Sequence, residues 1–282
     1  METAKQQVDT ERPLLEHIKE LVFRLKRILI SIGISFVIFF ATGPSFITLY
    51  GYKIPIIVPS LYASFSDFVV RYFINRELPT GMKLISLNPL DPIFASIYVS
   101  LYLAIFISMP IILRELWAFV APGLYEHEKK LIKKAILPGF GLFALGSAFA
   151  YFIIIPFMLI FVYRFDLVLG VEPTLSVRAY INTIVILMFA TGLAFELPLI
   201  MAGLTYLGLV SYDGWKKNWR WGVLISFIIA WLISPGTTGG LIETTIGTIL
   251  SLLYFAGVLV ARYIERKNKS NKNQIITPLS AK

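Results

Sequence analysis

Six long apolar segments constrain the fold of this chain more than any other feature. In the hydrocarbon core of a bilayer every backbone N–H and C=O must find its hydrogen bond within the protein, so such segments fold there as helices. Hydrophobic residues make up 57% of the 282 residues and charged residues only 15%, which excludes an ordinary soluble domain. We therefore predict an all-α integral membrane protein with six transmembrane helices, at about residues 21–42, 92–113, 135–163, 180–207, 221–234 and 241–262.

The distribution of Lys and Arg predicts the orientation of these spans. Cytoplasmic loops of membrane proteins are enriched in basic residues. Six Lys and Arg lie in residues 1–27, five in 114–134, three in 203–220 and six in 262–282, against four in 43–90 and two in 161–178. Both termini are therefore expected in the cytoplasm, with the protein in the cell membrane as a multi-pass chain. The first span is expected to stay as an anchor, because no small-residue cleavage pattern follows it.

The last two spans are predicted to be short, the fifth most of all. Residues 221–234 number 14, which at roughly 1.5 Å per residue reach about 21 Å across a hydrocarbon layer of about 30 Å. The final hairpin is then expected to thin the membrane or to lean on its neighbours. The alternative is that the basic side chains of residues 216–220 extend to the interface and make up the difference.

The regions outside the spans have distinct compositions. Residues 1–13 are polar and expected to be mobile, residues 14–262 form the six-span core, and residues 267–282 are expected to be a disordered cytoplasmic tail. Residues 13–27 have apolar positions at helical spacing and predict an amphipathic helix that runs into the first span. The long connection 43–90 is expected to form a cap on the outer surface.

Several classes of protein are excluded by what the chain lacks. It contains no Cys and only two His, His17 and His127, so metal sites, thiol chemistry and a resident cofactor are not expected. The formal charge of +9 is mostly explained by topology, so we expect anionic lipid rather than nucleic acid as its counterpart. We expect no enzymatic activity.

Glu196 is an acid within the fourth apolar segment. A carboxylate at membrane depth costs several kcal/mol on most estimates, so it is usually protonated, paired or directed into a polar cavity. It is therefore a candidate functional residue. The plainer alternative is a protonated Glu that is hydrogen-bonded to a neighbouring helix, helped by the helix-breaking Pro198.

Acidic and aromatic residues are combined in residues 110–130, between the second and third spans. Glu115, Glu126 and Glu128 lie where a membrane protein usually concentrates positive charge, which suggests a docking surface for a cationic partner. Glu126 and Glu128 also have a structural explanation, since acids stabilise the start of a helix. Phe119 taken alone would more often be an interfacial anchor.

Glu20, in the amphipathic segment, stands four residues before Arg24. This order gives an intrahelical ion pair worth about 0.2–0.5 kcal/mol. A surface salt bridge is therefore the simplest interpretation of Glu20 by itself.

Five segments in the same order resemble the TatC family, the multispanning receptor subunit of the twin-arginine protein translocase. The resemblance covers roughly residues 13–262, and WAFVAPGLYEHE is its most specific part. The segments are LLEHIKELVFRL, LNPLDP, PIILRELWAFVAPGLYEHEKK, FGLFALGSAFAYFIIIP and FATGLAFELP.

This resemblance implies a function and a set of residues. It implies binding of signal peptides that carry two consecutive arginines, and export of folded proteins by the proton-motive force together with TatA-type, and also TatB-type, single-span subunits and further copies of the chain. The family's signal-peptide residues fall on Glu20, Glu128 and Phe119, a proline of the outer loop falls on Pro59, and the intramembrane acid falls on Glu196. A carboxylate can accept the planar guanidinium fork bidentately, and Lys cannot copy that geometry. Glu196 is then expected to contact a single-span subunit.

Two departures from the family pattern limit what is implied. Val22 stands where many relatives have an arginine, and Thr237 and Thr238 stand in an outer loop where many have an acid. No role is therefore predicted for an arginine or an acid at those positions.

Two other functions remain as alternatives. A proton-coupled small-solute transporter would use Glu196 as its proton site, but residues 14–140 and 141–262 show no convincing internal repeat. An intramembrane hydrolase would need a nucleophile with a base, or a metal set, within the spans. Solute uptake into proteoliposomes would separate the transporter from the receptor.

Overall fold

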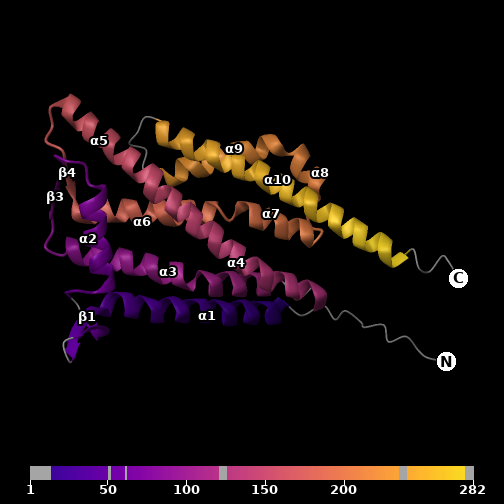
Figure 1. Cartoon of the computed structure of the whole chain (residues 1–282). Coiled ribbons are helices and arrows are strands. Elements are labelled where there is room, and N and C mark those ends of the chain that lie inside the picture. The colour runs from indigo at the N-terminus through magenta and orange to yellow at the C-terminus, as the bar shows by residue number, and fades with distance from the viewer. Residues whose placement is uncertain (1–13, 50–51, 61, 121–125, 235–239, 277–282) are drawn as a thin grey trace.

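The computed structural model describes residues 14–49, 52–60, 62–120, 126–234 and 240–276. Most of them are helical, and the long helices run side by side so that both termini emerge at the same end of the bundle (Figure 1). The helices are α1 (Leu14–Ala41), α2 (Phe65–Glu77), α3 (Asp91–Val120), α4 (Glu126–Phe149), the π-helix η2 (Ala150–Ile154), α5 (Ile155–Leu169), α6 (Val177–Ala194), α7 (Leu197–Tyr206), α8 (Tyr212–Lys217), α9 (Trp219–Ile233) and α10 (Leu241–Ile276).

Four helical stretches are long and apolar enough to cross a membrane: Asp91–Phe119, Ala135–Leu169, Val177–Tyr206 and Leu241–Lys267. A fifth, α9, is apolar but shorter, and α1 carries Arg24, Lys26 and Arg27 ahead of its apolar section. Together with α1 and α9, these stretches are consistent with the predicted six-span membrane protein. Residues 1–13, predicted to be mobile, and residues 277–282 of the predicted tail lie outside the described residues.

The last two helices correct one prediction. The fifth span is short as expected, because α9 has 15 residues. The sixth is not, because α10 has 36 residues and its apolar stretch has 27. Residues 267–276, expected in a disordered tail, continue α10 as helix. Once the apolar part has nucleated the helix, each further turn costs little free energy, and Lys and Gln are good helix formers.

Two small sheets and α2 form a cap at the end of the bundle remote from the termini (Figure 1). Strand β1 (Thr42–Leu49) pairs antiparallel with β2 (Tyr52–Pro59), and β3 (Lys83–Ile85) pairs parallel with β4 (Thr174–Ser176). The all-α prediction therefore holds for the spans, while the long connection 43–90 adds strands. Helix α2 begins with a capping box between Ser64 and Asp67, which satisfies backbone N–H groups at its first turn.

Asp91 explains the LNPLDP segment before α3. Its side chain is buried and accepts hydrogen bonds from the backbone N–H groups of Leu87 and Asn88, both at 3.1 Å, and from the Ser176 hydroxyl at 3.3 Å. The start of α3 is thereby tied both to the preceding turn and to β4.

The helices pack in a way that places α3 in the middle. Helix α1 packs chiefly against α3, where the Ser31 hydroxyl donates to that of Ser108 at 2.9 Å. Helices α4 and α6 cross closely, since a Cβ on Gly146 would lie 2.7 Å from the Thr191 carbonyl oxygen and 2.9 Å from the Gly192 Cα. Helix α10 packs against α9 and α7. Small residues at such crossings let helix backbones approach within a membrane.

Candidate functional site

Three of the site residues predicted from the sequence lie at the end of the bundle where the termini emerge (Figure 1). Glu20 is in the first turns of α1, Phe119 in the last turn of α3 and Glu128 in the first turn of α4. The structure describes the backbone of Glu128 but not its side chain. The fold therefore brings three positions that are up to about a hundred residues apart in the sequence to one end of the bundle.

Glu115 is the centre of an arginine–glutamate cluster, which we define as Glu20, Arg24, Arg27, Arg114 and Glu115. Its side chain is only 2% exposed. Its Oε1 lies 2.6 Å from Arg114 Nη2 and 3.6 Å from Arg27 Nη1, and its Oε2 lies 3.1 Å from Arg24 Nη1. A buried carboxylate would cost several kcal/mol without such partners, so the arginines are what allow an acid at this position.

Arg24 bridges two carboxylates. Its Nη2 and Nε lie 2.5 Å and 3.1 Å from Glu20 Oε1, while its Nη1 faces Glu115. The intrahelical pair of Glu20 with Arg24 is thus confirmed. Both carboxylates already bind a guanidinium, and the cluster holds three arginines against two glutamates.

The aromatic residues at the end of α3 lie next to this cluster. Phe119 follows Glu115 by four residues, so the two share a face of the helix, and Phe119 is partly buried. Trp117 packs across the bundle, because a Cβ on Gly203 of α7 would collide with its ring. The end of α3 is thereby fixed between α1 and α7.

Glu196 lies at a break in the fourth span, between α6 and α7. The break follows from Pro198, which cannot donate a backbone hydrogen bond. Glu196 is 4% exposed, and neither of its carboxyl oxygens has a hydrogen-bond partner among the described residues. The alternative of a Glu hydrogen-bonded to a neighbouring helix is therefore wrong within that part of the chain.

The surroundings of Glu196 are apolar. A Cβ on Gly139 of α4 would lie 3.3 Å from its Oε2 and 2.6 Å from Leu113 of α3. Its chain neighbours Ala194 and Leu197 line a groove of about 380 Å³ between the fourth span and α9, whose walls also carry Trp215, Trp221 and Tyr254. An unpaired acid thus stands beside a mostly apolar groove.

Pro59 is not near these residues. It ends β2, opposite Thr42 of β1, and is exposed in the cap at the other end of the bundle. The chain therefore does not join Pro59 to Glu20, Phe119 or Glu128 in one site.

Comparison with known proteins decides the family. The family model described as Sec-independent protein translocase protein (TatC) matches residues 16–246. The chain belongs to the TatC family. It is 31% identical over 257 residues to the TatC protein of Cenarchaeum symbiosum, covering 90% of this chain and 96% of that one, and 32% identical over 262 residues to that of Aquifex aeolicus, covering 91% and 98%.

Solved TatC structures have the same fold. A crystal structure of the twin arginine translocase receptor TatC superposes with a TM-score of 0.69 at 29% identity, covering 88% of this chain and 99% of the other. The resemblance stated from sequence is confirmed. This TatC chain is accordingly a multi-pass membrane protein and a component of a Sec-independent protein translocase, in a family of transport proteins rather than enzymes.

Sequence reasoning did not assign a role to Glu115 beyond a place on the docking surface. Its partner Arg24 on α1 is 91 residues away in the chain, so no local pattern shows that they meet. The one available signal is that an acid directly follows a basic residue at the end of an apolar span. Among the described residues no group of three or more His, Cys, Asp or Glu is placed to hold a metal ion.

Proposed function

We propose that this TatC chain is the receptor of its translocase and binds twin-arginine signal peptides at the end of the bundle formed by the start of α1, the end of α3 and the start of α4. This end faces the cytoplasm in the proposed orientation, with both termini inside the cell. Together with single-span subunits, either TatA-type alone or TatA-type and TatB-type, and with further copies of itself, the chain exports folded proteins with the proton-motive force. Membership of the TatC family supports this function.

One observation carries the proposal: Arg24 bridges Glu20 and Glu115 at this end. The acids here are already arranged to accept a guanidinium, through contacts of 2.5 Å and 3.1 Å. A charge-assisted pair of this kind is about twice as strong as a neutral hydrogen bond. The face therefore has the chemistry that an arginine pair in a peptide requires.

An incoming peptide would bind by exchange. One of its arginines would take the place of Arg24 on Glu20, and Arg24 would remain on Glu115, so no carboxylate would be left unpaired. The second arginine would meet Glu128 on α4. A lysine forms only a point contact and could not replace the planar fork of Arg24, which accounts for a preference for arginine.

The apolar part of the signal peptide would lie along the apolar surface that leads to Glu196. The groove beside Ala194 and Leu197 supports this path. Glu196 itself would contact a single-span subunit, because its carboxyl oxygens have no hydrogen-bond partner among the described residues. In a Glu196→Ala variant we expect loss of crosslinking to the subunit and loss of export; retention of both would remove this contact.

Peptide binding by the purified protein in detergent tests the receptor function. A labelled twin-Arg signal peptide and its twin-Lys counterpart are titrated against the native chain, Glu20→Gln and Glu128→Gln. We expect the native chain to prefer the twin-Arg peptide by about tenfold, the equivalent of roughly 1.4 kcal/mol, and both variants to lose that preference.

Glu16→Gln is the matched control, since Glu16 is an exposed acid in the first turn of the same helix. It should bind both peptides as the native chain does. Equal weak binding of both peptides by every protein would leave only an apolar surface and would refute the receptor function.

A further inference from the structure

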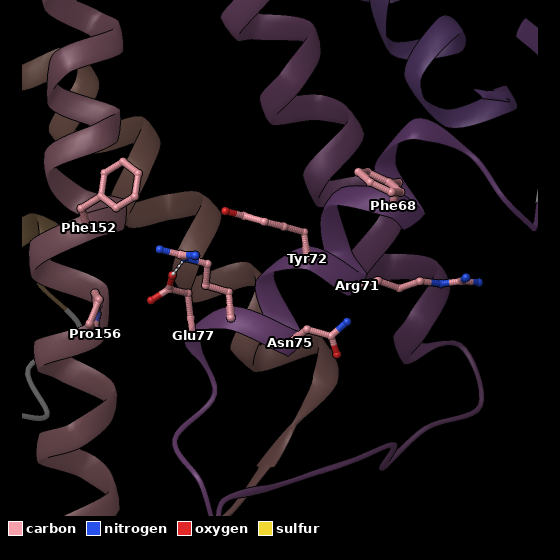
Figure 2. A pocket seen from close by; sticks show the side chains of 8 residues that line it. Phe68, Arg71, Tyr72, Asn75, Glu77, Phe152 and Pro156 are labelled. Atoms are coloured by element: carbon pink, nitrogen blue, oxygen red, sulfur yellow. Dashed lines mark ion pairs between the residues drawn. The ribbon is translucent and has the colours of Figure 1, made fainter. Parts of the chain in front are cut away.

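A hollow of about 800 Å³ lies in the cap region, and Figure 2 shows the side chains that line it. Helix α2, which carries most of these residues, is at the opposite end of the bundle from the arginine–glutamate cluster (Figure 1). The hollow is bounded on one side by α2 and on the other by η2 and α5. Its lining residues are Phe68, Arg71, Tyr72, Asn75, Arg76, Glu77, Phe152 and Pro156. None of the functions discussed above uses it.

The π-helix η2 shapes the far wall of this hollow. Such a turn carries one extra residue, and it commonly marks a functional position in a helix. Tyr151 is buried against α2, with its ring 5.3 Å from Phe73 and 6.4 Å from Tyr72. The next residue, Phe152, stands at the edge of the hollow and is 61% exposed. The extra residue therefore places one aromatic ring in the packing and the next one on the surface.

The near wall supplies hydrogen-bond donors. Figure 2 shows the Tyr72 hydroxyl directed toward the helix that carries Phe152, whereas Arg71 extends away from it. The Arg76 Nε lies 3.9 Å from Glu77 Oε1, and Arg76 is 60% exposed whereas Glu77 is only 8% exposed. The ion pair is long, and the Arg76 side chain is exposed while that of Glu77 is buried. The guanidinium of Arg76 therefore remains accessible to a ligand.

The charges of the lining favour an anion. Arg76 is 60% exposed whereas the one acid of the lining, Glu77, is 8% exposed, so the charge that this side of the hollow presents is positive, while Arg71 extends away. Arginine binds phosphate through its planar fork. Asn75, which is exposed, adds a further amide at the rim.

An apolar surface leads away from the hollow along the third span. Leu145 precedes Phe152 by seven residues, so the two lie on nearly the same face of the span, and they are 62% and 61% exposed. Both belong to the stretch Ala135–Leu169, which is apolar enough to cross a membrane. A molecule bound in the hollow can therefore place a hydrocarbon chain against this face.

We propose that this hollow binds one phospholipid with an anionic headgroup. The phosphodiester would accept hydrogen bonds from Arg76 and Tyr72, and an acyl chain would lie along Phe152 and Leu145. Basic pockets beside membrane spans recognise lipid headgroups in this manner. The occupant is a lipid rather than a free anion, because the hollow opens onto an exposed apolar face and is lined by three aromatic rings.

Lipid retention by the full-length protein tests the proposal. The purified chain is incubated with phosphatidylglycerol, with phosphatidylcholine, or with inorganic phosphate alone, and bound lipid is counted by native mass spectrometry. We expect the native chain to retain one phosphatidylglycerol and to prefer it over phosphatidylcholine. Inorganic phosphate should not displace it.

Variants assign the lipid to this hollow. Arg76→Gln is expected to weaken retention about tenfold, roughly the loss of one charge-assisted contact, and Tyr72→Phe, which keeps the ring, to weaken it severalfold. Arg164→Gln is the control, because Arg164 is an exposed arginine on α5 that does not line the hollow. Arg76 is 60% exposed, and Tyr72→Phe keeps the ring of a side chain that is 46% exposed, so both variants should fold.

Three outcomes would overturn the proposal. Retention equal in Arg76→Gln, Tyr72→Phe and Arg164→Gln would place the lipid elsewhere. Equal retention of phosphatidylcholine would show that the hollow does not distinguish an anionic from a zwitterionic headgroup. Displacement of the lipid by inorganic phosphate would show that the hollow is a simple anion site.

Discussion

Replacing Glu115 by Gln should destabilise the protein measurably, because this carboxylate holds α1 to α3. The change keeps the shape of the side chain and removes the charge that faces three arginines. The pair with Arg24 is the best shielded, since the Arg24 side chain is 20% exposed, and a hydrogen bond to a charged group contributes about 1.5–3 kcal/mol. The pairs with Arg27 and Arg114 involve side chains that are 51% and 55% exposed, and such pairs contribute about 0.2–1 kcal/mol each.

These contributions set the expected magnitude. Gln can still accept one hydrogen bond, so we expect Glu115→Gln to lower the free energy of unfolding by about 2 kcal/mol, a factor of roughly 30 in the unfolding equilibrium. Reversible unfolding in mixed detergent micelles, followed by tryptophan fluorescence, measures this change.

A double-mutant cycle identifies the partner. Combining Glu115→Gln with Arg24→Gln should give a coupling of about 1–2 kcal/mol, whereas combining it with Arg114→Gln should give less than about 0.5 kcal/mol. Equal couplings for the two arginines, or a coupling with Arg24 below about 0.3 kcal/mol, would refute the reasoning that burial makes the Arg24 pair the stronger one.

Three further predictions concern other parts of the fold. Gly146→Ala should lower the free energy of unfolding by about 1–3 kcal/mol, because its Cβ would meet backbone atoms of α6 at 2.7–2.9 Å. Gly141→Ala on the same helix, whose Cβ would have nothing within 4 Å, should be neutral or stabilising. Equal losses of stability in the two variants would contradict this. Ser64→Ala removes the side-chain cap of α2 and should lower its stability by about 1 kcal/mol, seen as faster amide exchange in its first turn and not in the rest of the helix. Lys83 Nζ, 2.6 Å from Glu172 Oε1, lowers the pKa of the Glu172 carboxyl below its ordinary value. The ion pair is therefore fully present above that ordinary pKa and is lost as pH falls through the lowered one. In Lys83→Met a ¹³C titration of the carboxyl should show a higher midpoint, and an unchanged midpoint would disprove the contact.

Local patterns predicted part of this molecule, and contacts between distant residues explain the rest. The apolar segments, the short fifth span and the Glu20–Arg24 pair follow from spacing along one helix. The position of Glu115 among arginines from α1 does not, because it depends on how α1 and α3 pack. The π-helix at Ala150–Ile154 was also not predicted, although it stands just before Pro156, which cannot donate a backbone hydrogen bond.

The sequence also predicted only part of the candidate site. Sequence placed Glu20 and Phe119 at one end of the bundle and Glu196 within a span, and the structure agrees with these positions. It did not reveal that Glu20 is already engaged by Arg24 and linked through it to a second acid. Charge balance within a site depends on side chains from separate elements, which no single segment contains.

The order in which the helices pack bears on how the chain is made. Helix α1 packs chiefly on α3, α4 on α3 and α6, and the final α9–α10 hairpin on α7, so each span finds a main partner close to it in the order of synthesis. The packing of α1 on α3 therefore needs no later span, although the long connection 43–90 must close before the two helices meet. Arg24 and Glu115 join the first two spans without a contribution from the later ones, so the biosynthetic machinery need not hold six unpartnered helices in the membrane at once.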